Sequence, residues 1–261
     1  MSRNLRIGGA AGTEGGLRFT ELAAKKSNVK GNISFHEVVY YDDFDGKAID
    51  NVNDYTVAAI AEGAATVVVP HMCRLATATN DNDDIDVAMG VEWYGQYNAT
   101  LEARFRINDV DMTGTNIGFS DATGEAADLI AMMLTTGSLV STAADFVGFA
   151  HDADATTDNL YAVSVKGGND GAIINSGSLP TDGKYYTVRV ELVDNGTTTD
   201  AKFYVNTSGK AIDPYNDYIG EELDAVTRTT ALCPYIAHIN HGEAAANTLD
   251  VDYIKVWQDR Y

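Results

Sequence analysis

The chain ends with TLDVDYIKVWQDRY, residues 248–261, and this stretch predicts a closing β-strand. Apolar residues at 249, 251 and 253 alternate with Asp250 and Asp252, which is the period of a strand with one buried and one solvated face. We expect the two aspartates on the solvated face. After Tyr253 the apolar residues continue in the opposite phase, which predicts a bulge near Tyr253 or a strand covered on both faces.

The same alternation recurs along the chain, in runs at 101–107, 186–192 and 201–205. Further strands are expected at 56–61, 65–70, 116–121, 146–151, 159–167 and 234–241. Turn sequences separate the runs, and Asn195-Gly196 is a strong hairpin signal. Residues 125–134 fit either a short helix or a strand. Many short strands without a βαβ rhythm predict an all-β, two-sheet sandwich.

Charge divides the chain into two regions, an N-terminal arm (1–37) and a sandwich (38–261). The net charge is −20, yet the Gly-rich arm carries more basic than acidic residues. Its basic residues are Arg3, Arg6, Arg18, Lys25, Lys26 and Lys30. The arm is either a disordered tail or an extended anchor that docks on an acidic protein. The acidic remainder argues against nucleic acid as a partner. No apolar run predicts a membrane span or a secretory signal.

Three stretches together resemble the concanavalin A-like jelly roll of legume lectins and glucanases. These are VVYYDDFDGKAID (38–50), LEARFRINDVDMTGTNIGFSD (101–121), and YYTVRVELVDNGTTTDAKFYVN (185–206) followed by LDVDYIKVWQ (249–258). The resemblance implies a concanavalin A-like jelly-roll sandwich in which 101–121 forms one side of a sugar groove.

The catalytic motif of the laminarinase-type hydrolases is absent from this chain. Those enzymes place two carboxylates on one strand face as Glu-x-Asp-x-(x)-Glu, because residues i, i+2 and i+4 share a face. At the expected place stand Glu125 and Asp128, which are three apart and would face opposite ways. Asp109 and Asp111 lie in a loop, where turn-forming aspartates are ordinary. The Gln-x-His strand of the alginate-lyase type is also missing. We therefore expect no catalytic residue and no enzymatic activity.

Two acidic stretches are candidates for calcium. Asp152, Asp154, Thr156 and Asp158 recur at every second position, like the first half of an EF-hand loop, but the Gly and the final Glu of that loop are missing. The stretch DNDDID (81–86) is a weaker candidate. Solvated acidic loops are the simpler interpretation, so no metal or cofactor is expected.

The histidines are expected to be structural. His238 and His241 are three apart and would point to opposite faces of a strand. Cys73 and Cys233, the only cysteines, lie in strand-like contexts and are expected to be buried thiols without a bridge.

The arm resembles a segment of tailed-phage proteins. LRFTELAAKKSNVKGNIS (17–34) is similar to a stretch that leads into appended domains of phage fibre and capsid-surface proteins. This resemblance implies a non-enzymatic virion structural protein, a capsid decoration (cement) or head-fibre protein on the outer capsid surface. Its partners would be the major capsid protein or other virion proteins, and a homo-oligomer is compatible with this role.

Two other functions remain open. The first is a lectin-like protein that binds host-surface glycans, with Trp93, Tyr94 and Tyr97 stacking on sugars. These residues could equally be ordinary core aromatics. The second is a polysaccharide hydrolase or lyase with unfamiliar catalytic residues, for which Asp109 and Asp111 would be the first candidates.

Overall fold

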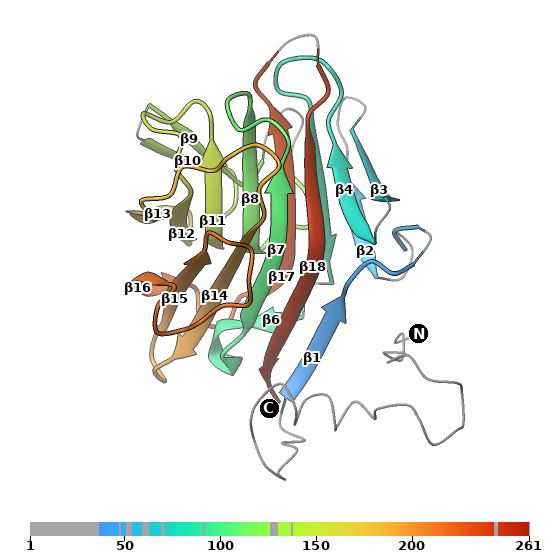
Figure 1. Cartoon of the computed structure of the whole chain (residues 1–261). Helices are drawn as coiled ribbons and strands as arrows, with labels where there is room; N and C mark the ends of the chain where they lie inside the picture. Colours follow the sequence, from blue (N-terminus) through green and yellow to red (C-terminus); the bar gives the residue numbers. More distant parts are fainter. Residues whose placement is uncertain are drawn as a thin grey trace, which may run out of the picture.

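The computed structural model describes residues 37–260 except 47, 51–53, 59–62, 69–70, 91, 126–129, 137 and 243–244. The described residues form a sandwich of two antiparallel β-sheets (Figure 1). The expectation of an all-β, two-sheet architecture is therefore confirmed. The arm, including its six basic residues, lies outside the described residues except for Glu37, which starts β1.

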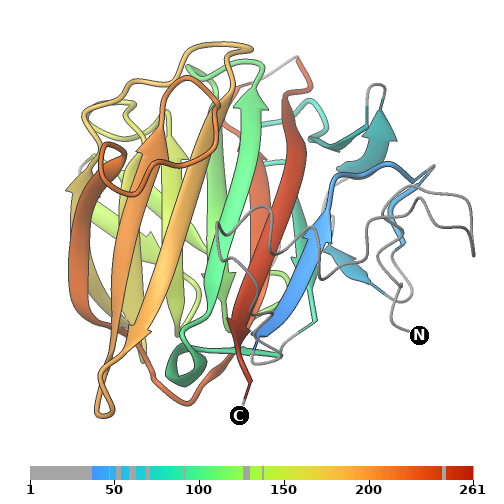
Figure 2. The ribbon, with the colours of Figure 1, turned by 60° about the horizontal axis from the view of Figure 1, so that its bottom comes forward.

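Sheet A forms one layer and has the order β16-β15-β14-β7-β18-β4-β3, with β1 also paired to β18. Its strands are β1 (Glu37–Asp42), β3 (Ala64–Val68), β4 (Met72–Ala76), β7 (Thr100–Ile107), β14 (Tyr186–Asp194), β15 (Thr199–Asn206), β16 (Tyr218–Val226) and β18 (Thr248–Asp259). Figure 2 shows its long central strands β14, β7 and β18 side by side.

Sheet B forms the other layer and has the order β13-β12-β11-β8-β17-β5-β2, with β6 also paired to β17. Its strands are β2 (Tyr55–Ala58), β5 (Asp84–Met89), β6 (Trp93–Tyr94), β8 (Thr113–Ser120), β11 (Phe146–Asp152), β12 (Tyr161–Lys166), β13 (Asn169–Asn175) and β17 (Ala231–Asn240). A short 3-10 helix, η1 (Gly95–Tyr97), follows β6. A separate hairpin, β9 (Met132–Thr135) and β10 (Ser138–Ser141), completes the structure.

The main core lies between the two sheets. It takes every second residue of the facing strands, as the alternation predicts. Phe149 of sheet B meets Phe203 of sheet A edge to face, with ring centroids 5.8 Å apart. Burying a side chain of this size stabilises the fold by roughly 1.5–3 kcal/mol, so this interface holds the sheets together.

The closing strand β18 contains the expected bulge. Its register against β7 shifts between Val251 and Tyr253, so Asp252 is the extra residue. The expectation of two solvated aspartates is wrong for Asp250, which is 3% exposed. It is covered because arginines on both neighbouring strands reach over it.

The Asn195-Gly196 hairpin is confirmed between β14 and β15. Gly196 has φ +88°, a conformation that glycine adopts without strain. The Asn195 side-chain oxygen accepts hydrogen bonds from the backbone of Thr197 and Thr198. Part of 125–134 forms β9, which answers the helix-or-strand alternative for Met132–Thr135.

Six strands were not expected from the sequence, namely β4, β5, β6, β10, β13 and β16. Cys73 on β4 and Cys233 on β17 are free, buried thiols in different sheets. Among the described residues, no helix is long and apolar enough to cross a membrane.

Candidate functional site

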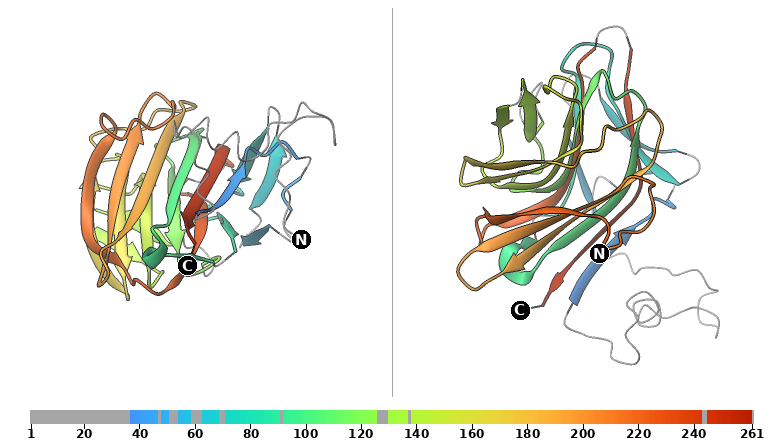
Figure 3. Two further views of the ribbon diagram at one scale, coloured as in Figure 1. Left: turned by 90° about the horizontal axis from the view of Figure 1, so that it is seen from below. Right: turned by 60° about the vertical axis from the view of Figure 1, so that its left-hand side comes forward.

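The outer face of sheet B, where a sugar groove was expected beside β8, is covered by the chain itself. The β9–β10 hairpin and the segments around it lie on this face (Figure 3). They close a second apolar cluster against strands β5, β11, β12 and β17. Its buried members are Ala88, Ile130, Ala131, Met132, Leu134, Leu139, Ala143, Phe146, Ala150, Val163, Val165, Cys233, Tyr235, Ala237 and Ile239. This part of the face is a packed core and not a groove.

Hydrogen bonds fix the hairpin to the sheet. The Asn116 side chain of β8 both donates to the Met132 carbonyl (2.9 Å) and accepts from the Met132 amide (2.8 Å). The Leu134 amide donates to Asp152 of β11 at 2.7 Å. All these groups are buried, and each hydrogen bond contributes a net of about 0.5–1.5 kcal/mol to the closed arrangement.

Strand β8 pairs with β11 on one side and with β17 on the other. Of the segment at 125–128, where the sequence places Glu125 and Asp128, only Glu125 is among the described residues. The side chains of Val147 and Phe149 belong to the main core, whereas Phe146 and Ala150 belong to the outer cluster. Along that outer face of this fully described strand, Asp152 is the only carboxylate. The outer face of β11 therefore does not carry the pair of carboxylates that the laminarinase-type motif places on one strand.

A buried carboxyl group lies beneath the β9–β10 hairpin and the segments around it, which together are called the cover. Asp86 of β5 accepts hydrogen bonds from the Tyr235 hydroxyl (2.7 Å) and from the Glu125 amide (2.8 Å). Burial raises the pKa of Asp86 to about 6, although both hydrogen bonds oppose the shift. The Ala131 amide donates to the Tyr235 hydroxyl (3.2 Å), so this network also ties the cover to the sheet.

The first two residues of the calcium candidate at 152–158, Asp152 and Asp154, lie next to a histidine. Asp152, Asp154 and His241 each offer a ligand atom, and these atoms lie within 4.8 Å of one another. His241 Nε2 is 3.1 Å from Asp152 Oδ1, and Nδ1 is 3.9 Å from Asp154 Oδ2. These three residues could hold a metal ion. Asp158 does not belong to this cluster.

Both oxygens of the Asp152 carboxylate already accept hydrogen bonds, Oδ2 from the Leu134 amide and Oδ1 from the Asp154 amide. Burial alone would lower the pKa of His241, but the hydrogen bond to Asp152 and the charges of Asp152 and Asp154 raise it overall. The two carboxylates therefore favour the protonated form of His241, which accounts for their position around the imidazole.

The other acidic stretch, DNDDID (81–86), runs into a strand. Asp84 and Asp86 lie on β5 and are buried, while Asp83 accepts a hydrogen bond from the Asn80 amide (2.7 Å). Two histidines are held by buried hydrogen bonds. His151 Nε2 donates to the Val110 carbonyl (2.9 Å), and His238 Nδ1 is hydrogen-bonded to the Thr115 hydroxyl (2.9 Å). Burial lowers the pKa of both imidazoles, in keeping with structural roles.

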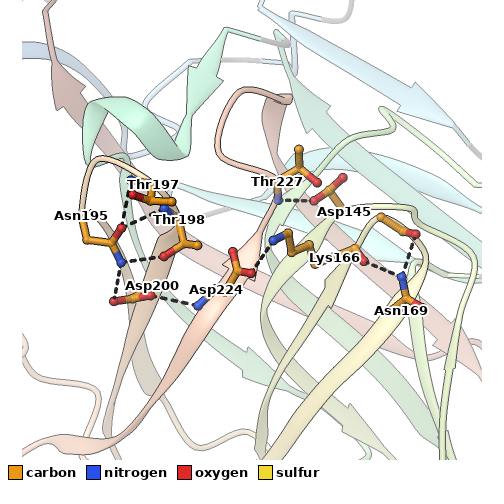
Figure 4. Close-up of polar contacts among 10 residues, drawn as sticks. Asp145, Lys166, Asn169, Asn195, Thr197, Thr198, Asp200, Asp224 and Thr227 are labelled. Carbon is orange, nitrogen blue, oxygen red and sulfur yellow. Dashed lines mark hydrogen bonds and ion pairs between the residues drawn. The ribbon is translucent and has the colours of Figure 1, made fainter.

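A polar hollow of about 470 Å³ lies where the edges of the two sheets meet (Figure 4). Its walls come from the β12–β13 turn and the end of β16. They include three carboxylates, Asp170, Glu222 and Asp224, against one lysine, Lys166. Lys166 Nζ is 2.5 Å from Asp224 Oδ2. The hollow therefore carries net negative charge.

The position of Asp224 in this hollow is held by its neighbours. Its backbone is left-handed (φ 56°), which is unfavourable for a residue other than glycine, and the β15–β16 register shifts nearby. The Asp200 side chain accepts a hydrogen bond from the Asp224 amide (2.9 Å), and the Asn195 turn in turn bonds Asp200 (Figure 4). The other Asp224 oxygen, Oδ1, is buried without a hydrogen-bond partner, and so is Ser164 Oγ.

The outer face of sheet A carries a set of ion pairs that sequence analysis missed. Asp250 accepts from Arg74 (2.6 Å) and from Arg106 (2.9 Å), and Asp252 pairs with Arg104 (2.6 Å). Hydrogen bonds from the two arginines lower the pKa of Asp250, although burial acts in the opposite direction. Cross-strand register could have indicated these pairs, because Asp250 faces Arg74 and Arg106 directly.

The three aromatic residues proposed for glycan contact differ in exposure. Trp93 belongs to the main core and is 6% exposed, so its side chain is not available to a glycan. The prediction that Trp93 contacts a glycan is therefore corrected, because its side chain packs between the two sheets. Tyr94 and Tyr97 are half-buried, with their rings 5.6 Å apart in a T-shaped arrangement.

Comparisons with known proteins agree with the architecture. The fold is similar to that of Rv0315, an immunostimulatory antigen and pseudo β-1,3-glucanase of Mycobacterium tuberculosis (TM-score 0.55, 13% identity, covering 84% of this chain and 98% of that one). It is also similar to the Emp47p carbohydrate recognition domain (TM-score 0.55, 11% identity, 88% and 100%). A third similar structure is a protein of unknown function from Shewanella oneidensis MR-1 (TM-score 0.51, 12% identity, 95% and 97%).

No family model matches the sequence, and no curated protein matches it. Identities of 11–13% carry the fold alone and leave activity open. The chain has the concanavalin A-like sandwich fold that glucanase-like proteins share with a carbohydrate recognition domain.

Proposed function

We propose that this protein is a non-enzymatic virion structural protein, a capsid decoration or head-fibre protein of a tailed bacteriophage, anchored by its N-terminal arm. The observation that carries the non-enzymatic part is the filled outer face of sheet B. The face beside β8 is occupied by Met132, Leu134 and their neighbours, which are fully buried. A polysaccharide chain has no room there.

The anchoring part rests on the arm. Its basic residues contrast with an acidic sandwich, and a basic segment is attracted to an acidic partner. Its resemblance to segments of phage fibre and capsid-surface proteins adds to this. The partner would be the major capsid protein or another virion protein, and the location the outer capsid surface.

The position of β1 fits attachment from one end. Glu37 at the start of β1 pairs with Asp259 near the end of β18, so the first and last strands of the sandwich meet at one side of the molecule (Figure 1). A protein attached through the segment before Glu37 would present the opposite end, with the loops near Asp152 and His241, away from the attachment point.

A capsid-binding assay tests this proposal. Full-length protein is incubated with capsids of the encoding virus that lack it, and bound protein is measured after sedimentation. The variant Lys25→Glu/Lys26→Glu/Lys30→Glu should bind at least tenfold more weakly, because it reverses the charge of the arm. The matched control, Lys184→Glu/Lys202→Glu/Lys210→Glu, makes the same charge change on the sandwich and should bind like the wild type. Absence of binding, or equal losses in both variants, would refute anchoring by the arm.

A second candidate is lectin-like glycan binding. The observation that favours it is the half-buried Tyr94–Tyr97 pair on a fold shared with a carbohydrate recognition domain. Aromatic faces of this kind stack on sugar rings. A glycan array with the full chain tests it, and a hit that survives in Tyr97→Ala would remove this pair as the site.

A further inference from the structure

We propose that the hollow between the β12–β13 turn and β16 is a docking site for an extended, basic segment of a partner protein, with a lysine or arginine side chain entering the hollow. The proposal is independent of capsid anchoring, since it concerns a different surface.

The lining of the hollow favours a cation. Asp170, Glu222 and Asp224 outnumber Lys166, which bonds only one oxygen of Asp224. The other oxygen, Asp224 Oδ1, is buried and has no hydrogen-bond partner. The Asp224 side chain as a whole is 41% exposed, so its carboxylate can be reached by a cation from outside. An ammonium or guanidinium group supplies both the donor and the positive charge.

Space inside the hollow depends on a glycine. A Cβ at Gly171 would lie 2.2 Å from Ser164 Oγ and 3.4 Å from Glu222 Oε1. Any side chain at this position would therefore collide with the wall. The Ser164 side chain, 1% exposed and with a hydroxyl that has no hydrogen-bond partner, lies in the same wall behind Gly171.

The edges of the sandwich next to the hollow suit an extended segment. Among the described residues, β16 pairs only with β15, and β13 pairs only with β12, so both are edge strands. Edge strands offer backbone groups to an added strand. Three large apolar side chains are exposed on them, at 37% for Ile173, 44% for Tyr218 and 68% for Leu223. Leu223 also lines the hollow.

The same charges select the partner. A second acidic sandwich would bring like charges against Asp170, Glu222 and Asp224, which disfavours pairing between copies through this edge. A basic segment meets no such repulsion. Electrostatic complementarity of this kind sets specificity more than affinity.

Fluorescence anisotropy with full-length protein at physiological salt tests the proposal. The probe is labelled octalysine, with octaglutamate and unlabelled maltose as comparisons. The test variant is Asp224→Asn, because asparagine tolerates the left-handed backbone and keeps the size of the side chain. The matched control is Asp111→Asn, which makes the same charge change at an exposed loop residue on the opposite end of the sandwich. Leu223→Ser, at an exposed position, removes the apolar contact without touching the core.

Octalysine should bind the wild type, and Asp224→Asn should weaken binding roughly fivefold while Asp111→Asn leaves it unchanged. Leu223→Ser should weaken it less. Octaglutamate should not bind. Equal binding by both asparagine variants would mean attraction to the overall acidic charge and would overturn the proposal. So would displacement of octalysine by maltose, which would identify a sugar site instead, or a complete lack of octalysine binding.

Discussion

Tyr235 donates a hydrogen bond of 2.7 Å to Asp86, and both side chains are buried on the outer face of sheet B. The face of the fold where a sugar groove was expected thus holds a sealed polar pair beneath an apolar cover. This pair ties the covering segment to the sheet, because the Tyr235 hydroxyl also accepts from the Ala131 amide.

Asp86 should make stability depend on pH. Burial raises its pKa to about 6 in the folded protein, above the value of 3.8 for a free side chain. Its stabilising contribution is therefore complete below pH 3.8 and is lost as the pH rises through about 6. The loss is on the order of 2–3 kcal/mol. Urea unfolding at pH 4 to 7 should show that the wild type loses stability relative to Asp86→Asn over this range. A constant difference between the two proteins would contradict the assignment.

Removing the Tyr235 hydroxyl should destabilise the protein at every pH. Tyr235→Phe leaves the Ala131 amide and one Asp86 oxygen without a partner. The expected loss is about 1–3 kcal/mol in the free energy of unfolding. Tyr185→Phe is a useful comparison, because that ring is half-exposed and stacks under Arg104. A loss no larger than that of the comparison variant would mean that the buried network contributes little.

The two aspartates of β18 should behave differently. Asp250 is buried and bridges two arginines that are about a third exposed, so Asp250→Ala should cost about 1–3 kcal/mol. Asp252 and Arg104 are each 29% exposed, so Asp252→Ala should cost at most about 1 kcal/mol. Thermal and urea unfolding of both variants at pH 7 checks this. Equal losses would show that burial does not distinguish the two pairs.

Acid should weaken the Asp250 bridge. Its pKa is lowered in the folded state, so its contribution is present above the unfolded value near 3.8 and is lost as the pH falls through the folded value. The difference in stability between the wild type and Asp250→Ala should therefore shrink below pH 4. A difference that grows on acidification would be inconsistent with this bridge.

His241 should act in the opposite sense. Its pKa is raised beside Asp152 and Asp154, so its contribution is complete below about pH 6.5 and is lost as the pH rises through the folded value. The wild type should exceed His241→Gln in stability by more at pH 5.5 than at pH 8.5. If the gap is the same at both pH values, the pKa of His241 is not raised in the folded protein.

Sequence reasoning worked best where one strand alone carries the signal. The alternation in β7, β14 and β18, the Asn195-Gly196 turn and the bulge at Asp252 are all local patterns. Two of the strands that it missed, β4 and β5, are short and mostly buried, so neither shows the contrast between a buried and a solvated face.

The site could be predicted only in part, because it depends on pairings between distant residues. Nothing in the sequence places β11 beside β8, Asp86 under Tyr235, or His241 beside Asp152, since these pairs are set by the crossover connections of the sandwich. The position of the β9–β10 hairpin on sheet B could not be predicted for the same reason. Met132 and Leu134 look like ordinary strand residues until the face that they cover is known.

The cover should be part of the cooperative core. Met132 is fully buried and Met133, next to it, is only partly so. Met132→Ala should cost about 2–4 kcal/mol, and Met133→Ala clearly less, because a cavity forms only in the first. Urea unfolding measures both. Equal, small effects would indicate a loosely packed flap.

Native-state hydrogen exchange of the Met132 and Leu134 amides tests the closed face most directly. Both amides donate to buried side chains, Asn116 and Asp152. They should exchange about as slowly as the amides of β7 in the main core, through global unfolding alone. Exchange as fast as that of the exposed turn at Asn195 would show a lid that opens over the sheet, and would contradict a filled, non-catalytic face.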